Sequence, residues 1–150
     1  MDFEPKDHSR RPVLLNNYVS MLGKYGQETK KTEYLDQAIE LVRMAISEIP
    51  SGDTDWLMAR CNLGNLLGQR FRRYLIKEDI DEAISLYEEA LSKLPTEHFN
   101  RVGCLKGLGV WYSERFERFH DPQDELQALS FYRMELEITT ATPSVRVELA

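Results

Sequence analysis

The stretch LGNLLGQRF at residues 63–71 returns in altered form 45 residues later, as LGVWYSERF at residues 108–116. A fixed offset of this size is the signature of a repeat architecture. The same offset aligns three successive copies without insertion or deletion at many positions, including Pro5, Pro50 and Pro95, then Ala38, Ala83 and Ala128, then Ile39, Ile84 and Leu129. We therefore expect one repeat domain over residues 1–150. Its parts are repeat 1 at about 8–52, repeat 2 at about 53–97, repeat 3 at about 98–141, and the start of a further helix or a cap at 142–150.

Each copy predicts two α-helices. Apolar residues within 78–94 recur at steps of three and four, which places them on one face of a helix. Pro95 then ends this helix, because proline cannot continue the hydrogen-bond ladder. No stretch alternates with period two, so the predicted fold class is all-α without a sheet. The first helices are expected at 12–29, 56–75 and 100–119, and the second helices at 33–48, 78–93 and 123–138.

Small residues recur where the two helices of a copy should approach each other. Gly64 and Gly109 lie within first helices, and Ala83 and Ala128 lie within second helices. A glycine inside a helix costs about 1 kcal/mol of propensity, so a packing reason is expected for it. We predict that these residues serve close helix packing rather than chemistry.

The repeat resembles the tetratricopeptide repeat. Copy three has Leu108-Gly109-x-x-Tyr112 and later Ala128-x-x-x-Tyr132, which match the family pattern. The resemblance covers residues 5 to about 140 and implies an α-α superhelix, a solenoid of three antiparallel helix pairs. The usual unit has 34 residues. The long unit here is similar to the repeats of large fungal signalling proteins, in which such arrays accompany nucleotide-binding or caspase-like domains. The chain is accordingly expected to be a segment of a longer array.

Some positions depart from the family pattern. Val19 stands where the glycine belongs in copy one, and Glu135 and Thr140 replace a small residue and the proline in copy three. Outer units of a stack often deviate, because one of their faces meets solvent. We expect these departures to mark copies one and three as the outer units.

The overall charge argues against several classes of partner. The chain carries a formal net charge of −6, whereas nucleic-acid-binding surfaces are normally basic. No apolar run approaches the roughly 20 residues of a membrane span, and no secretory signal precedes the repeats. We expect no nucleic-acid or membrane partner. The two cysteines have no metal-ligand spacing, which fits a reducing compartment and predicts a cytoplasmic protein.

The sequence offers little for catalysis. Metal-binding, phosphate-binding and nucleophile motifs are absent, so we expect no enzyme activity, no cofactor and no metal. The acidic clusters at 78–82 and 121–125 fall at helix starts, where the helix dipole explains them. The arginines of the run at 69–74 are expected to pair with acidic residues of second helices, or to cover apolar surface with their stems.

The family resemblance implies a partner-binding face. In tetratricopeptide arrays the first helices line a concave face, and three side chains of each point into it. Carried over by alignment, these are Asn16, Ser20, Lys24, Cys61, Asn65, Gln69, Lys106, Val110 and Glu114. Amides and lysines could hold an extended peptide, so the first expectation is a scaffold that binds a protein or peptide on this face. The alternative is a structural segment of a larger signalling protein, without a ligand, that self-associates through its open ends.

Overall fold

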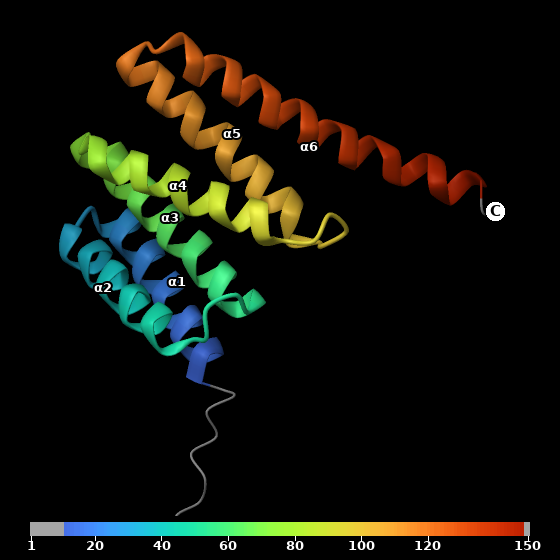
Figure 1. Cartoon of the computed structure of the whole chain (residues 1–150). Helices are drawn as coiled ribbons and strands as arrows, with labels where there is room; N and C mark the ends of the chain where they lie inside the picture. The colour runs from blue at the N-terminus through green and yellow to red at the C-terminus, as the bar shows by residue number, and fades with distance from the viewer. Residues whose placement is uncertain (1–10, 149–150) are drawn as a thin grey trace, which may run out of the picture.

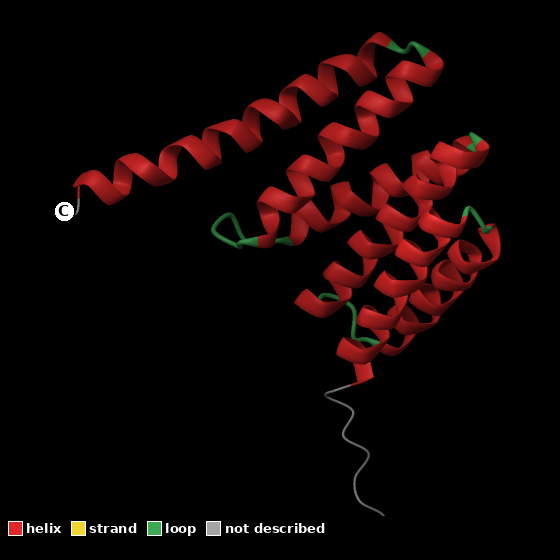
Figure 2. Ribbon diagram, turned by 180° about the vertical axis from the view of Figure 1, so that it is seen from behind, coloured by secondary structure: helices red, strands yellow, loops and turns green. Residues whose placement is uncertain are grey.

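A computed structural model describes residues 11–148 of the chain, with side chains described for residues 14–140. The described part consists of helices joined by short turns and contains no strand (Figures 1 and 2). The helices are α1 (Arg11–Thr29), α2 (Thr32–Glu48), α3 (Thr54–Tyr74), α4 (Lys77–Lys93), α5 (Asn100–Phe119) and α6 (Pro122–Glu148). The all-α prediction is confirmed, and the first five helices lie close to their predicted limits.

Each pair of helices is closed by the same backbone turn. Lys30, Leu75 and His120 occupy equivalent positions after α1, α3 and α5, and each has a left-handed φ between 56° and 59°. The Leu75 amide donates to the Phe71 carbonyl at 2.7 Å, and the His120 amide does the same to Phe116. This bond satisfies a carbonyl that the helix end would leave unpaired. The turn reverses the chain, so that the second helix of each pair packs back on the first.

The pairs follow one another in chain order. Every helix contacts the next one along the chain, and the first helices also touch each other, α1 with α3 and α3 with α5. Among the described residues, α1 and α2 make no contact with α5 or α6. Each pair therefore packs only against its neighbours, and its core forms from the apolar faces turned toward them.

Glycines mark the closest helix contacts, as predicted. A Cβ added at Gly64 would lie 2.8 Å from the Tyr87 ring and 3.3 Å from the carbonyl oxygen of Ala83. At Gly109 it would lie 2.6 Å from the ring of Tyr132. These aromatic rings of the second helices occupy the space that a side chain on the first helix would need. The prediction of a packing role for the small residues is confirmed.

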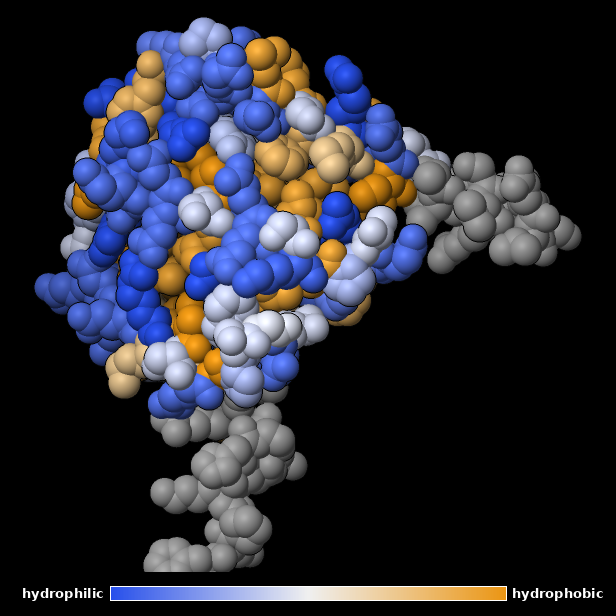
Figure 3. Space-filling model, viewed as in Figure 1, coloured by the Kyte–Doolittle hydropathy of each residue, from blue (hydrophilic) through white to orange (hydrophobic). Residues whose placement is uncertain are grey.

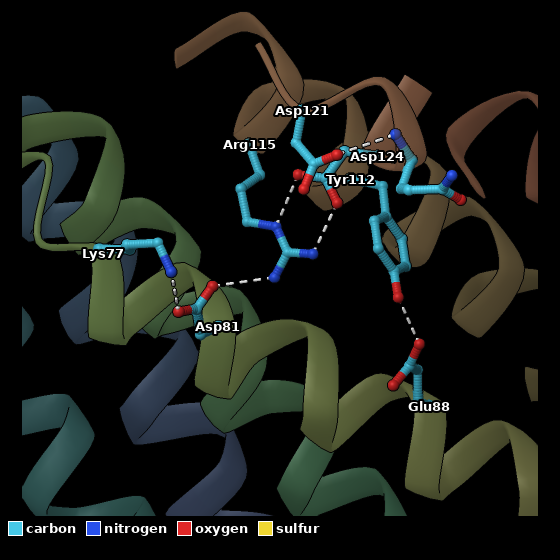
Figure 4. Close-up of polar contacts among 8 residues, drawn as sticks. Lys77, Asp81, Glu88, Tyr112, Arg115, Asp121 and Asp124 are labelled. Atoms are coloured by element: carbon cyan, nitrogen blue, oxygen red, sulfur yellow. Dashed lines mark hydrogen bonds and ion pairs between the residues drawn. The ribbon is translucent and has the colours of Figure 1, made fainter. Parts of the chain in front are cut away.

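Two partly buried ion clusters join neighbouring pairs, and we call them the arginine triads. Arg115 of α5 donates to both carboxylate oxygens of Asp124 of α6, at 2.9 and 2.6 Å, and to Asp81 of α4 at 2.8 Å (Figure 4). Forty-five residues earlier, Arg70 of α3 donates to both oxygens of Asp79 of α4, at 2.7 Å each, and to Asp36 of α2 at 3.1 Å.

Each triad ties the two helices of one pair to the second helix of the pair before it. Hydrogen bonds donated to the paired aspartates raise the pKa of both arginines, so these side chains remain charged. The predicted pairing of Arg70 and Arg115 with acidic residues of second helices is confirmed.

The last helix differs from its prediction. The second helix of copy three was expected to end at 138, with a further helix or a cap at 142–150. The structure instead has one continuous helix that runs to Glu148 and projects beyond α5 (Figure 1). Thr140 stands where Pro50 and Pro95 stand in the other copies, so the backbone donor is kept at this position, and the helix continues through Pro143. The Thr140 hydroxyl donates back to the Leu136 carbonyl, a bond compatible with a helix interior. Residues 149–150 lie outside the described part.

Candidate functional site

The residues predicted to line a binding face do not form one continuous surface. Ser20, Lys24, Asn65 and Gln69 come together, while Val110 and Glu114 lie in a second place and Asn16 in a third. The face seen in Figure 3 is largely polar, and apolar side chains gather on it in patches. The three places are therefore described separately below.

The first place is a hollow between α1 and α3, called the α1–α3 hollow. Its volume is about 230 Å³, and four of the predicted residues line it. Ser20 and Lys24 approach from α1, and Asn65 and Gln69 approach from α3. Its full lining is Val19, Ser20, Gly23, Lys24, Gln27, Asn62, Asn65, Leu66 and Gln69.

One polar atom in this hollow is unusual. The Gln69 Oε1 atom is buried and has no hydrogen-bond partner among the described residues. A buried amide oxygen without a partner is destabilising by about 1–3 kcal/mol, so most such atoms in proteins are bonded. Lys24 is on the rim, with its side chain 78% exposed and held only by a 4.0 Å ion pair with Glu28. The hollow thus offers one accessible cation, while protein atoms cover the unpartnered oxygen of Gln69.

The second place is a hollow of about 530 Å³ between α3, α5 and α6, called the α3–α5 hollow. Val110 and Glu114 line it, together with Phe71, Arg72, Leu75, Ser113, Glu117, Arg118 and Tyr132. Arg72 donates to Glu114 across this hollow, and its guanidinium lies 4.9 Å from the centre of the Trp111 ring. The two opposite charges therefore neutralise each other within the α3–α5 hollow.

Arg72 was missed as a site residue. The sequence signal was present, because Arg72 belongs to the basic run at 69–74, but its partner was expected on a second helix. Arg72 instead pairs with Glu114 of a first helix, and Arg73 donates to the backbone carbonyls of Gly26 and Gln27. The second-helix pairing is therefore wrong for these two arginines.

The remaining predicted residues line neither of these two hollows, although Asn16 borders the α1–α3 hollow through Asn62. Asn16 lines a third hollow, of about 190 Å³ between α1, α2 and α3, and accepts a hydrogen bond from the side chain of Asn62. Lys106 is exposed on α5 and lines none of the three hollows. Cys61 is 8% exposed, so its predicted place on an open groove is wrong.

Cys61 is covered because a second thiol lies against it. Its Sγ atom is 3.6 Å from Sγ of Cys104 on α5, and both cysteines are buried and free of disulfides. The hydrogen bond with Cys104 and burial raise the pKa of the Cys61 thiol. A raised pKa leaves little thiolate, the form that acts as a nucleophile. Cys61 is therefore a packing residue of the α3–α5 contact.

Two carboxylates of the acidic clusters and one histidine are engaged by other groups in the structure. Asp79 and Asp124, from the two acidic clusters, are each 3% exposed and bound by the arginines of the triads. Arginine pairing, rather than the helix dipole alone, explains why an aspartate stands at these helix starts. The Nδ1 atom of His98 accepts a hydrogen bond from the Asn100 amide, which fixes the turn before α5.

Two further searches cover the part of the chain that the structure describes. Within it, no three histidine, cysteine, aspartate or glutamate side chains are grouped so that they could hold a metal ion. None of its helices combines the length and the apolar character that a membrane span requires.

Comparisons with known proteins add no relative to this picture. No protein-family model, no curated protein and no solved structure matches the chain.

Proposed function

We propose that the three helix pairs form a solenoid of the tetratricopeptide type, which acts as a scaffold and binds a peptide or partner segment along its first helices. The proposal is supported by the recurrence of the same turn and the same arginine triad at one spacing, and by the contacts of each pair with its neighbours only. Helix pairs stacked in this way generate extended concave surfaces. In this proposal the chain acts in the cytoplasm and catalyses no reaction.

The observation that carries the proposal is the α1–α3 hollow, in which the side-chain amides of Asn65 and Gln69 lie beside the accessible Lys24. An extended peptide presents backbone N–H and C=O groups in alternation, and side-chain amides can pair with both. Asn65 is exposed in this hollow and offers an amide that both donates and accepts. Ser20 adds little, because its hydroxyl already donates to the Asn16 carbonyl. Gln69 and Asn65 are therefore the main backbone contacts.

The charges on the same face specify the side chains of the occupant. Lys24 at the rim of the α1–α3 hollow is free to pair with a carboxylate. In the α3–α5 hollow, Arg72 and Glu114 neutralise each other, while the exposed Leu75 and Tyr132 supply apolar surface. We expect a segment that places an acidic residue near α1 and an apolar residue between α3 and α5.

The experiment is a selection of random peptides displayed on phage against the immobilised full chain. Peptides enriched on the chain should contain an acidic residue, and their binding should weaken at least about tenfold, about 1.4 kcal/mol, in the double variant Asn65→Ala/Gln69→Ala. Ser85→Ala, at an exposed position of α4 outside these hollows, is the matched control and should bind unchanged. Enriched peptides that bind the double variant as well as the original chain would place the binding face elsewhere.

A further inference from the structure

The two outer faces of the array carry matched replacements of the arginine triad. Counting back 45 residues from Arg70 and Asp79 gives Tyr25 and Tyr34, so copy one has two aromatic rings where the later copies have an ion pair. These rings pack edge to face with their centres 5.1 Å apart. Counting forward 45 residues from Asp81 gives Leu126 on α6. The arginine and both of its aspartates are thus replaced by uncharged side chains at the outer faces.

α1 exposes an apolar stripe that is buried in the other first helices. The stripe consists of Leu14, Tyr18, Met21 and Tyr25, which are 65%, 50%, 70% and 53% exposed, and we call it the α1 stripe. Its steps of four, three and four residues place it on one side of the helix. The positions equivalent to Tyr18 and Met21 are Leu63 and Leu66 in α3, then Leu108 and Trp111 in α5, all 4% exposed or less.

The buried equivalents of Met21 lie against the preceding pair. The Leu66 side chain would be 3.1 Å from a Cβ at Gly23 of α1, and the Trp111 ring would be 2.4 Å from a Cβ at Gly68 of α3. A bulky residue therefore lies over a small residue of the previous first helix at both internal junctions. The next small residue in this series is Ser113 of α5, 45 residues after Gly68. The α1 stripe consequently presents Met21 to a surface like the one around Ser113.

α6 exposes the complementary stripe. Leu126, Leu129 and Leu136 are 59%, 57% and 61% exposed, and we call them the α6 stripe. The positions equivalent to Leu129 are Ile39 in α2 and Ile84 in α4, which are 4% and 3% exposed where the next pair covers them. The α6 stripe is therefore the surface on which a following pair would pack.

We propose that the α6 stripe of one copy of this chain packs on the α1 stripe of another, in the arrangement that α2 has with α3 and α4 has with α5. In such a junction Tyr25 takes the place of the triad arginine, and Leu126 of the neighbouring copy takes the place of the aspartate. An arginine opposite Leu126 would lack the aspartate that Arg70 and Arg115 find on the preceding unit, whereas Tyr25 carries no charge and needs no such partner. The two replacements fit each other, and this favours a second copy as the occupant.

The geometry of this contact determines the assembly. The two stripes are different surfaces, so the interface is heterologous and leaves one stripe free at each end of a dimer. Copies should add in a line rather than close into pairs. This inference uses the outer faces and not the hollows, so it does not depend on the proposed peptide binding.

The experiment measures the mass of the full chain in solution by sedimentation velocity over a wide range of protein concentration. The mass should rise with concentration past that of a dimer without a plateau. Met21→Glu in the α1 stripe and Leu129→Glu in the α6 stripe should each abolish this rise, because each buries a charge in the junction. Both positions are exposed in the single copy, so the far-UV circular dichroism and urea midpoints should stay unchanged.

Mixing the two variants distinguishes the head-to-tail contact from other contacts. The Met21→Glu chain keeps its α6 stripe and the Leu129→Glu chain keeps its α1 stripe, so a mixture should form dimers of one each and stop there. A wild-type mass equal to the monomer at all concentrations would overturn the proposal. It would also be overturned if either variant alone associated, since that requires a contact between like faces. The hollow variant Asn65→Ala/Gln69→Ala should still assemble, which separates this test from that of peptide binding.

Discussion

Two glycines inside helices should respond in opposite ways to the same substitution. Gly68 of α3 and Gly103 of α5 both lack the positive φ that would strain an alanine, so the backbone tolerates Gly→Ala at either position. A Cβ at Gly68 would lie 2.4–2.5 Å from three ring atoms of Trp111, whereas a Cβ at Gly103 would meet nothing within 4 Å. The difference between the variants therefore reports packing alone.

The magnitudes follow from these contacts. Carbon atoms normally approach to about 3.5–4.0 Å, so the Trp111 ring would have to move by about 1 Å or more. That ring is 3% exposed and has little room, and overpacking of this kind costs about 1–3 kcal/mol. Replacing a helical glycine by alanine returns about 0.5–1 kcal/mol at either position. We expect Gly103→Ala to raise the free energy of unfolding. The free energy of unfolding of Gly68→Ala should be about 1–3 kcal/mol lower than that of Gly103→Ala.

Thermal unfolding followed by far-UV circular dichroism measures this difference. In a domain of this size about 1 kcal/mol shifts Tm by about 2–4 °C, so the two variants should separate by several degrees. Urea midpoints with unchanged slopes should rank them in the same order. If Gly68→Ala raised Tm as much as Gly103→Ala, the close contact between α3 and Trp111 would be wrong.

Three further predictions concern the second helices. Ala83→Leu, at a fully buried position, should lower the free energy of unfolding, measured by urea titration, by about 1–3 kcal/mol, while Ser85→Leu on the exposed side of α4 should change it little, and equal effects would refute the orientation of α4. The hydrogen bond from Arg43 holds the pKa of Glu82 below its ordinary value, so its contribution is present at neutral pH and is lost as pH falls through the folded pKa. The urea midpoints of the wild type and Glu82→Gln should therefore differ most at neutral pH and converge below about pH 4, and a gap that widened on acidification would contradict the pairing. Thr140→Pro removes a second backbone donor within three residues of Pro143 and should fray α6 beyond 140, which backbone chemical shifts and amide exchange at 141–148 can detect, and unchanged helical shifts there would show that proline does not stop this helix.

Local signals in the sequence were sufficient to place the helices. The apolar spacing of α4 and the stop at Pro95 depend on residues within one or two turns of each other, so the limits of α4 could be predicted. The end of α6 could not be predicted, because Thr140 does not end a helix and gives no indication of where the helix ends. The left-handed turns at Lys30, Leu75 and His120 carry no glycine, which is the residue that normally signals this conformation.

The candidate site was predicted less well than the fold. Alignment to a family gives the direction of a side chain from its own helix, but not what the neighbouring helix places over it. Cys61 was assigned to an open groove, and Cys104 of α5 covers it. The two hollows depend on which first-helix side chains meet across a junction, as Arg72 and Glu114 do over a separation of 42 residues. Such contacts leave no pattern in the local sequence.

The arginine triads also limit how an array of this kind can change its length during evolution. Each triad takes an aspartate from its own unit and another from the unit before, always at the same separations along the chain. A duplication of one whole unit copies both the arginine of that unit and the aspartate that contacts the arginine of the next unit. Every triad in the longer array is then complete. An insertion or deletion of any other length within the array would leave a partly buried guanidinium facing the wrong residue. Gain and loss of material should therefore proceed by complete units, with the uncharged versions of the triad kept for the first and last.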